Sequence, residues 1–354
     1  MQAAVMVGFR EPLVVQHLPD PEPGPTDAVV RVYACGICRT DWHVWQGDWG
    51  WLGRTPSLPV VPGHELAGVV EAVGKEVVSF RPGDRVTVPF HISCGRCEYC
   101  SAGRSNLCLT GGGLGVRRNG GYAERVLIPE ADVNLLRLPE NVGFVSAAAL
   151  GCRYMTAYHG IVDRAQLRPG EWVAIFGVGG VGLSAVQIAS ALGARPIAVD
   201  IREDKLEKAR AEGAVAAVNA AREDPVEAIR QLTDGGADIT VEALGAAETT
   251  VPAVLALRRG GRHVQIGLTS QKEQGRVSIP VDYLVRYEIS FLGSFGCPVA
   301  SHRGLLNLVA MGRVDPGRLV TRTVSLQEST QVLQAMSEFG TLGFHVIVPG
   351  GGEP

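Results

Sequence analysis

Residues 172–182 decide the fold of this 354-residue chain, and they read Trp172-Val173-Ala174-Ile175-Phe176-Gly177-Val178-Gly179-Gly180-Val181-Gly182. The five leading apolar residues predict a buried strand. The glycines that follow form a G-x-G-x-x-G turn, which opens the helical pattern of residues 183–189. Such a turn lets the backbone approach a pyrophosphate closely, and the helix N-terminus attracts that anion. The segment therefore predicts a dinucleotide site at the start of a βαβ unit.

An acidic residue follows the next predicted strand. Ile197-Ala198-Val199 leads into Asp200, where a carboxylate can bind both hydroxyls of an adenosine ribose and repel a 2′-phosphate. NAD is therefore favoured over NADP, although Arg202 leaves NADP open. A glycine-rich turn without a ligand is the alternative interpretation, and the strand, helix and acid together argue against it.

The pattern of predicted strands and helices differs between two parts of the chain. Residues 1 to about 150 read as β-rich, with strands predicted at 29–33 and 68–73 and a turn feeding a strand at 81–88. From about residue 153, short strands alternate with helical patterns, which is typical of a parallel sheet. The predicted strands there are 172–176, 196–199, 239–241 and 261–266, and a helix covers 204–210. A helix near 302–312 and a strand near 345–348 are predicted after residue 296.

Composition narrows the functional class. The length indicates about two domains, and 46% hydrophobic residues provide a packed core. A net charge of −3 gives no general attraction for nucleic acid or anionic membranes. Met1–Gly8 lacks the basic start of a signal peptide, and the glycines in the uncharged run Val173–Ala194 favour strand–turn–helix over a membrane span. We therefore expect a cytoplasmic protein with neither nucleic acid nor membrane as a partner.

Four cysteines lie close together in the pattern C-x2-C-x2-C-x7-C, namely Cys94, Cys97, Cys100 and Cys108. Thiolates bind zinc in closed tetrahedral sites, so this spacing predicts a structural zinc site. Two disulfides in a secreted loop are the alternative. Eight cysteines in 354 residues are too sparse for a secreted disulfide scaffold, which favours zinc.

Cysteine and histidine also occur in three short motifs elsewhere in the chain. These are Cys35-Gly36-Ile37-Cys38, Gly63-His64-Glu65 and Gly151-Cys152-Arg153. The first motif could be a redox pair, but no thioredoxin-like pattern surrounds it. A catalytic zinc uses three protein ligands, for which two cysteines and one histidine are a known set, and keeps its fourth position open.

Together these motifs resemble the zinc-dependent medium-chain alcohol dehydrogenases, in that family's order and over essentially the whole chain. The matching elements are Cys38-Arg39-Thr40-Asp41-Trp42-His43, Gly63-His64-Glu65, the four-cysteine loop, Cys152, and the Gly177–Gly182 turn with Asp200. The resemblance implies an α/β plus β fold. A Rossmann domain with a doubly wound parallel sheet would cover residues 153–296. A β-rich, GroES-like catalytic domain would cover residues 1–152 and 297–354 and carry both zinc sites.

The resemblance also implies a role for each residue near the metal. The implied ligands of the catalytic zinc are Cys38, His64 and Cys152. Asp41 would orient His64, and Glu65 would lie beside the metal as a transient ligand. Thr40 would take the alcohol proton and His43 would pass it to solvent.

Other residues are implied to contact cofactor or substrate. Arg39 is expected at the cofactor pyrophosphate, and Thr156 and Val181 are expected against the nicotinamide. The full predicted cofactor-binding set is Arg39, Thr156, Gly177, Gly179, Gly180, Val181, Gly182, Asp200, Arg202 and Lys205. Trp49 and Phe90 are expected to line the substrate pocket, where an aromatic wall favours a hydrophobic alcohol. For the clustered tryptophans, a loop packed by its own aromatic rings is an equal alternative.

The activity implied by the resemblance is a reversible hydride transfer between a primary or secondary alcohol and NAD, with two zinc ions per chain. Zinc held by two thiolates lowers the pKa of a bound alcohol, and a cleft between the domains would bring the reacting carbon to the nicotinamide. A specialised substrate (a polyol, an amino-acid alcohol or a formaldehyde adduct) stays open, as does a nucleotide-binding sensor that has lost its chemistry. The complete ligand set argues against the sensor. We expect small-molecule alcohols, aldehydes or ketones as partners, and a homodimer or homotetramer formed through the nucleotide-binding domain.

The chain departs from the family at Phe344, where many relatives carry an arginine that touches the cofactor phosphates. We expect a weaker hold on the cofactor, or partial substitution by His345. We also expect Glu65 to lack an ionic partner and to be freer to approach zinc.

Overall fold

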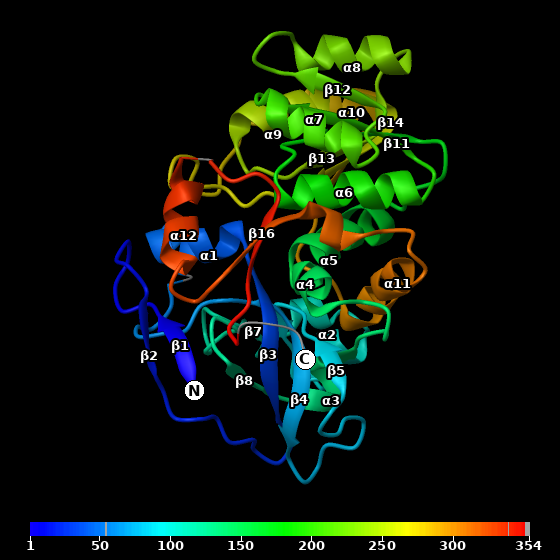
Figure 1. Ribbon diagram of the computed structural model, residues 1–354. Helices are drawn as coiled ribbons and strands as arrows, with labels where there is room; N and C mark the ends of the chain where they lie inside the picture. Colours follow the sequence, from blue (N-terminus) through cyan, green and yellow to red (C-terminus); the bar gives the residue numbers. More distant parts are fainter. Residues whose placement is uncertain (54, 339, 351–354) are drawn as a thin grey trace. The chain divides into compact units, whose positions relative to one another are not determined.

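The computed structural model describes residues 1–53, 55–338 and 340–350 and divides into two compact units (Figure 1). Unit 1 comprises Met1–Met155 and Gly296–Pro354, and unit 2 comprises Thr156–Phe295. Each unit has a large sheet of its own.

Unit 2 is built on a sheet whose strands follow the order β12-β11-β10-β13-β14-β15. Its strands are β10 (Trp172–Phe176), β11 (Arg195–Asp200), β12 (Ala216–Asn219), β13 (Ala237–Glu242), β14 (Leu257–Gln265) and β15 (Ser290–Gly293). Every neighbouring pair is parallel. All strands are parallel, and their order along the sheet reverses at β10, with β11 and β12 on one side and β13, β14 and β15 on the other. This is the doubly wound Rossmann sheet that the sequence predicted. The fold class of this unit is confirmed.

Helices connect the parallel strands of unit 2, as crossover connections require. They are α6 (Gly180–Ala191), α7 (Glu203–Ala211), α8 (Pro225–Thr233), α9 (Ala247–Leu255) and α10 (Val281–Tyr287). Before β10 come α5 (Arg153–Tyr158) and a π-helical turn, η4 (His159–Arg164). The uncharged run Val173–Ala194 therefore forms β10, the glycine turn and α6, as predicted. Among the described residues, no helix is long and apolar enough to cross a membrane.

Unit 1 is built on a mainly antiparallel sheet in the order β16-β17-β3-β4-β5-β9, with β8 also paired to β3. Its strands are β3 (Ala28–Ile37), β4 (Glu65–Val73), β5 (Arg85–Thr87), β8 (Arg125–Ile128), β9 (Leu136–Arg137), β16 (Val320–Val324) and β17 (Phe344–Ile347). Two small sheets pair β1 (Gln2–Val5) with β2 (Val14–His17) and β6 (His91–Ile92) with β7 (Gly112–Gly113). The β-rich first part of the chain is thus confirmed.

The two longest strands of unit 1, β3 and β4, contribute to its hydrophobic core. Val30, Val32 and Leu66 of these strands are buried in one cluster with Val86 and Tyr122. Strands that are covered on both faces read as near-continuous apolar runs, which is how the sequence of β3 reads.

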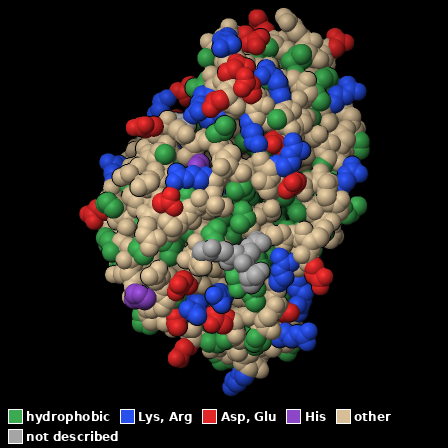
Figure 2. All heavy atoms as spheres, in the orientation of Figure 1, with side chains coloured by type: hydrophobic (Ala, Val, Ile, Leu, Met, Phe, Trp, Pro, Cys, Tyr) green, Lys and Arg blue, Asp and Glu red, His purple; other side chains and the backbone are tan. Residues whose placement is uncertain are grey.

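Helices border the sheet of unit 1. They are α1 (Arg39–Gln46), α2 (Glu98–Ser101), α3 (Ala131–Asn134), α4 (Phe144–Ala148), α11 (Val299–Ala310) and α12 (Ser329–Ser337). Short 3₁₀ turns are η1 (Gly50–Leu52), η2 (Ser105–Leu107), η3 (Ala149–Gly151) and η5 (Pro316–Leu319). Helix α1 packs against α12, and the two helices are drawn next to each other in Figure 1. The sequence had not predicted α1. On the molecular face in Figure 2, basic and acidic side chains are interspersed, in keeping with the net charge of −3.

Candidate metal and dinucleotide sites

Three predicted ligands from distant parts of the chain meet in unit 1. The Sγ atoms of Cys38 and Cys152 are 3.9 Å apart, and Nε2 of His64 lies 3.3 Å from Sγ of Cys38. All three donor atoms lie within 4.8 Å of one another. A tetrahedral zinc with Zn–S bonds of about 2.3 Å separates two sulfurs by about 3.8 Å, so this donor set fits the ion. We call these three residues the three-ligand cluster.

Local structure explains how Cys38 and His64 reach this cluster. Cys38 is the N-cap of α1, and its sulfur accepts a hydrogen bond from the backbone N–H of Thr40 at 3.2 Å. Gly63, which precedes His64, has a φ of +98°. A Cβ atom at Gly63 would meet the backbone nitrogen of Tyr122 at 2.9 Å, so glycine is required here for both conformation and space.

Asp41 connects the parts of the cluster. Its Oδ1 lies 3.1 Å from Nδ1 of His64 and accepts a hydrogen bond from the N–H of Gly63 at 3.2 Å. Its Oδ2 accepts a hydrogen bond from the N–H of Cys38 at 2.9 Å and so completes the capping box of α1. The structure therefore brings Asp41 to the position expected for a residue that orients His64, so that Nε2 faces the sulfur.

The electrostatics of the three-ligand cluster favour a thiolate at Cys38. Burial opposes ionisation of this thiol, but the hydrogen bond from Cys152 and the positive charges of His64 and Arg153 outweigh it, so the pKa of Cys38 lies well below its usual value. The hydrogen bond to Cys38, together with burial, raises the pKa of Cys152 well above its usual value. A metal cation at the cluster would favour thiolates at both residues.

Glu65 has an ionic partner, which corrects one expectation. Its carboxylate is fully buried and forms a bidentate ion pair with Arg153. The expectation that Phe344 leaves Glu65 without an ionic partner is therefore wrong. The sequence did not reveal this pair because its members lie 88 positions apart in the chain.

The two predicted proton-transfer residues both belong to α1, and one has a partner that the sequence reading missed. Nδ1 of His43 lies 2.6 Å from Oδ2 of Asp48, and the imidazole stacks on Trp49 with ring centroids 4.7 Å apart. Burial lowers the pKa of His43, although Asp48 opposes this effect. The imidazole is therefore neutral near pH 7, with Nδ1–H donating to Asp48. Asp48 directly follows Gly47, the αL cap that ends α1. A glycine that ends a helix is the sequence signal that could have placed Asp48 beside the last turn of α1, where His43 lies.

The two predicted pocket residues differ in their surroundings. Phe90 is partly buried, and its ring meets that of His64 edge-on at a centroid distance of 6.1 Å. Trp49 is only 6% exposed and belongs to the main core cluster of unit 1. This packing matches the alternative of a loop filled by its own aromatic rings, and a wall formed by Trp49 stays a prediction.

Two contacts of Arg39 lie within unit 1. Its guanidinium donates to the carbonyl oxygen of Met336 and lies over the Trp42 ring at 3.6 Å from the centroid. Burial lowers the pKa of Arg39 to about 10, so the side chain stays charged. Its predicted contact with a pyrophosphate stays a prediction.

The four-cysteine loop forms a second cluster in unit 1. Donor atoms of Cys94, Cys97, Cys100 and Cys108 all lie within 4.8 Å of one another. Backbone N–H groups point at these sulfurs: Cys97 donates to Cys94 at 3.4 Å, and Cys94 donates to Cys108 at 3.3 Å. Such donors, with that of Arg96 first, lower the pKa of Cys94 to about 6. Four sulfurs in a cage of N–H donors fit a closed zinc site, and all eight cysteines are free of disulfides.

The glycine turn of unit 2 has the backbone that dinucleotide binding needs. Gly177 has a φ of +84°, and Gly179 is the N-cap of α6. A Cβ at Gly182 would overlap the carbonyl oxygen of Gly177 and lie 3.0 Å from its carbonyl carbon. The first and last glycines of the motif are thus required by conformation and by close packing, while Gly179 leaves open space at its Cα. Val181 lies in the first turn of α6, and Thr156, in α5, is 8% exposed.

Asp200 ends β11 beside this turn. Its Oδ2 accepts a hydrogen bond from the N–H of Val178 at 3.0 Å, and its Oδ1 accepts hydrogen bonds from the N–H groups of Ile201 and Arg202 at 2.9 and 3.1 Å. The guanidinium of Arg202 forms a bidentate ion pair with the carboxylate of Asp204. Lys205 follows in the first turn of α7. The carboxylate expected to select NAD is therefore fixed against the turn.

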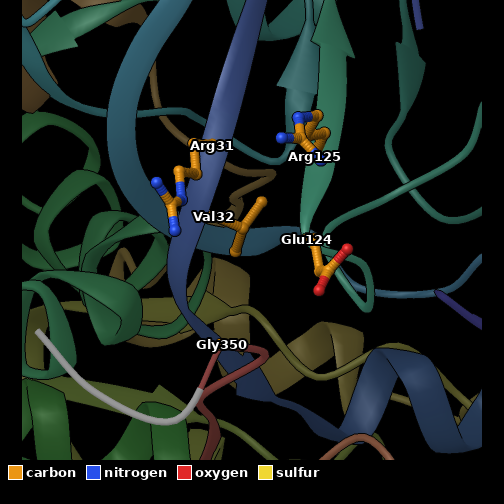
Figure 3. A pocket seen from close by; sticks show the side chains of 5 residues that line it. All are labelled: Arg31, Val32, Glu124, Arg125 and Gly350. Atoms are coloured by element: carbon orange, nitrogen blue, oxygen red, sulfur yellow. The ribbon is translucent and has the colours of Figure 1, made fainter. Parts of the chain in front are cut away.

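A separate hollow of about 170 Å³ lies elsewhere in unit 1 and contains none of the predicted site residues (Figure 3). Arg31 and Val32 line it from β3, Arg125 from the first position of β8, Glu124 from just before that strand, and Gly350 from the end of the described chain. The Arg125 guanidinium already contacts the carboxylates of Glu71 and Asp20, so its charge is compensated.

Comparisons with known proteins agree with this geometry. The family model described as "Alcohol dehydrogenase GroES-like domain" matches residues 24–140, and that described as "Zinc-binding dehydrogenase" matches residues 180–311. The NAD-dependent alcohol dehydrogenase of Sulfurisphaera tokodaii is 34% identical over 99% of this chain and 100% of its own length. The sorbitol dehydrogenase of Bacillus subtilis is 34% identical over 96% of this chain and 94% of its own length.

Among solved structures, the alcohol dehydrogenase TADH from Thermus sp. ATN1 is similar to this chain with a TM-score of 0.91. It is 35% identical, and the match covers 99% of this chain and 100% of that chain. Identity at this level, sustained over nearly the full length and accompanied by matches to both family models, shows that the chain belongs to the zinc-dependent medium-chain alcohol dehydrogenases.

Proposed function

We propose that this chain is an NAD-dependent zinc enzyme that transfers a hydride reversibly between an alcohol and NAD, with an aldehyde or ketone as the product. The observation that carries this proposal is the convergence of Cys38, His64 and Cys152 on one buried point. A zinc site with three protein ligands keeps one position for substrate, whereas the four-cysteine loop offers a closed, structural site. When bound, zinc supplies Lewis acidity toward an alcohol or carbonyl oxygen, and NAD supplies the hydride acceptor.

The chain's own residues would hold and move the proton of the alcohol. Thr40 follows the ligand Cys38 by two positions and would accept the alcohol proton at its hydroxyl. His43 would pass the proton on, and its contact with Asp48 supports this role because it leaves Nε2 as the acceptor. Asp41 would orient His64 through Nδ1.

The cofactor would bind to unit 2 through its glycine turn. The N-terminus of α6 would receive the pyrophosphate, and Asp200 would bind the ribose hydroxyls. Thr156 and Val181 would pack against the nicotinamide, while Arg39, Arg202 and Lys205 would contact the cofactor's polar parts. Support for NAD over NADP comes from the Asp200 carboxylate and from Asp204, which neutralises Arg202.

The preferred substrate is proposed to be a hydrophobic primary or secondary alcohol. Phe90, whose ring meets His64 edge-on, supports an apolar wall beside the three-ligand cluster. A specialised alcohol such as a polyol stays the second candidate, because a relative named sorbitol dehydrogenase is also 34% identical to this chain, over 96% of its length.

A panel of alcohols with the zinc-loaded protein and NAD, followed by NADH absorbance, tests the function. We expect turnover of hydrophobic alcohols to exceed that of polyols. Faster turnover of sorbitol or another polyol would select the second candidate. The decisive control is protein that holds two zinc ions and is able to bind NADH. If such protein oxidised none of the alcohols with NAD and reduced none of the matching carbonyls with NADH, the chain would be a sensor rather than an enzyme.

We also propose a homo-oligomer formed through unit 2. In the described part of the chain, β15 ends the six-stranded sheet and leaves one edge open to a further strand. Val281 and Val285 of α10 are 63% and 75% exposed, which is apolar surface that a partner subunit would cover. Light scattering during gel filtration would show a dimer or tetramer, and a monomer would contradict the proposal.

A cytoplasmic location is proposed from the chemistry of the cysteines. Two clusters of reduced thiols persist best where disulfides are kept reduced. Fractionation of cells that express the chain at its native level would test the location.

A further inference from the structure

Arg153 is a buried arginine next to the candidate ligand Cys152, at the start of α5. Its exposed fraction is 4%, and an arginine is almost never buried to this degree without a partner. The partner is Glu65, which follows the candidate ligand His64 and begins β4. The ion pair therefore joins two residues that each adjoin a member of the three-ligand cluster.

The pair uses both oxygens of the Glu65 carboxylate. Oε1 accepts hydrogen bonds from the backbone N–H and from Nε of Arg153, at 2.9 and 3.0 Å. Oε2 accepts one from Nη2 of the same arginine. Bidentate, charge-assisted bonds of this kind fix the orientation of a carboxylate as well as its charge. The backbone bond also ties the segment that carries Cys152 to the segment that carries His64.

Two further residues, Phe344 and Gly36, lie directly against this ion pair. The Arg153 guanidinium lies 3.7 Å from the centroid of the Phe344 ring, which is itself completely buried. A Cβ atom at Gly36 would come within 2.8 Å of Arg153 Nη2 and would overlap Oε2 of Glu65. A flat aromatic face on one side and a missing side chain on another leave the guanidinium one arrangement.

The chemical consequence concerns the fourth coordination position. Glu65 is an anionic oxygen donor, and carboxylate oxygen is a normal zinc ligand at about 2.0–2.2 Å. Because Glu65 directly follows the candidate ligand His64, its carboxylate without a partner would be a candidate donor to a metal at the three-ligand cluster. In the structure, both Glu65 oxygens are instead committed to Arg153.

We propose that Arg153 is a positioning residue that holds the Glu65 carboxylate away from the metal and so keeps the fourth position of the three-ligand centre open for substrate. This inference rests on the proposed function, because it requires a metal at Cys38, His64 and Cys152. Phe344 and Gly36 act through Arg153 by fixing its guanidinium.

The test uses the full-length protein with Co²⁺ in place of the cluster's zinc, and it reads the visible d–d spectrum and the affinity for imidazole, which competes for an open metal position. The variants are Arg153→Met, which frees Glu65, and Arg153→Met combined with Glu65→Gln, which also removes the anionic donor. Arg262→Met is the matched control, because it breaks another arginine–carboxylate pair, with Glu171 in unit 2. Spectra of the wild-type protein and of Cys38→Ser tell first whether the metal lies at this centre, so a failure of the proposed function is recognised separately.

We expect Arg153→Met to change the Co²⁺ spectrum, and to weaken imidazole binding by about 10- to 100-fold, the range by which losing an outer contact usually lowers the metal affinity or activity of such a site. The double variant should return both readouts toward wild type, and Arg262→Met should change neither. Wild-type spectrum and imidazole affinity in Arg153→Met would overturn the proposal. It would equally be overturned if the double variant kept the defect, since Arg153 would then act through something other than Glu65.

Loss of folding in Arg153→Met would move the test to Arg153→Lys, which keeps the charge and loses the two-pronged geometry. A partial spectral change in Arg153→Lys, reversed by Glu65→Gln, supports the proposal. No change in Arg153→Lys, in protein that keeps its metal, contradicts it.

Discussion

The carboxylate of Asp41 lies 3.1 Å from Nδ1 of His64, and the two side chains are 3% and 2% exposed. The same carboxylate accepts hydrogen bonds from the N–H groups of Cys38 and Gly63. One buried anion thus sets the ring orientation of one candidate ligand and the backbone of another. Burial is tolerable for this charge because each oxygen has polar partners.

Asp41→Asn is expected to weaken zinc binding at the three-ligand cluster about 10- to 100-fold, because a neutral amide holds the His64 ring less strongly than a carboxylate and has only one acceptor oxygen for the three N–H groups of His64, Gly63 and Cys38. Chelator-induced release of zinc, followed with a coloured indicator, measures the effect. Asp48→Asn is the matched control, because Asp48 contacts His43 rather than a ligand. Equal release rates for Asp41→Asn and wild type would show that Asp41 does not orient His64.

Cys38→Ser is expected to abolish alcohol turnover while NADH binding stays largely intact, because the glycine turn and Asp200 belong to unit 2 and do not depend on this sulfur. Steady-state NADH formation and titration of NADH fluorescence measure the two properties in the same preparation. A folded Cys38→Ser protein that no longer binds NADH would count against the separate assignment of metal and cofactor residues.

Asp200→Ala is expected to narrow the preference for NAD over NADP by at least about tenfold, because like-charge juxtaposition with the 2′-phosphate costs several kcal/mol. The ratio of kcat/KM values for the two cofactors measures it. Asp204→Ala should lower the ratio less. It removes the ionic partner of Arg202, which could then pair with the 2′-phosphate of NADP, but it leaves the repulsion by Asp200 in place. The cofactor assignment fails if the wild-type protein already prefers NADP.

Cys97→Ser is expected to remove one zinc ion per chain and to lower the melting temperature, because it opens a closed cage whose metal binding is coupled to folding. Metal analysis together with thermal unfolding provides the two readouts. Cys35→Ala is a suitable control, because Cys35 is buried and lies outside both clusters. Unchanged metal content and melting temperature in Cys97→Ser would mean that the loop holds no zinc.

Local patterns allowed much of the fold to be predicted. The strand at 172–176 and the turn at 177–182 follow from apolar runs and glycine spacing, which depend on neighbouring residues alone. Helix α1 escaped prediction because its N-cap is Cys38, whose sulfur replaces the usual hydroxyl or carboxylate cap. The predicted domain boundaries after residues 152 and 296 stay predictions.

The candidate site was less accessible from the sequence wherever it depends on long-range pairing. The family resemblance supplied Cys38, His64 and Cys152, whereas no local rule joins Glu65 to Arg153 across 88 positions. Substituting Phe344 for an arginine looked like the loss of a partner, although the structure supplies that partner from α5. The charge balance of a buried site depends on every element packed around it. Comparing one position with the family therefore predicted wrongly that Glu65 has no ionic partner.

The last prediction concerns His302 in α11, which is fully buried; among the residues that the structure describes, neither of its ring nitrogens has a hydrogen-bond partner. Burial lowers the pKa of His302 to about 4. An unfolded histidine has a pKa of about 6.5, so between these values the unfolded chain binds the additional proton and the folded chain does not. The folded state is therefore fully favoured by this group above about pH 6.5, and it loses that advantage as the pH falls toward 4, by up to about 2 kcal/mol at pH 5.

His302→Leu removes this titration and two unpaired polar atoms, so the variant should equal or exceed the wild type in thermal stability at pH 7.5. At pH 5 its advantage should be larger, because only the wild type is penalised by protonation of the unfolded chain. Melting temperatures of both proteins across this pH range measure the difference. Since the variant leaves all predicted zinc ligands in place, the pH dependence of metal binding cancels in the comparison. Parallel curves for the two proteins would show that His302 titrates alike in the folded and unfolded chains.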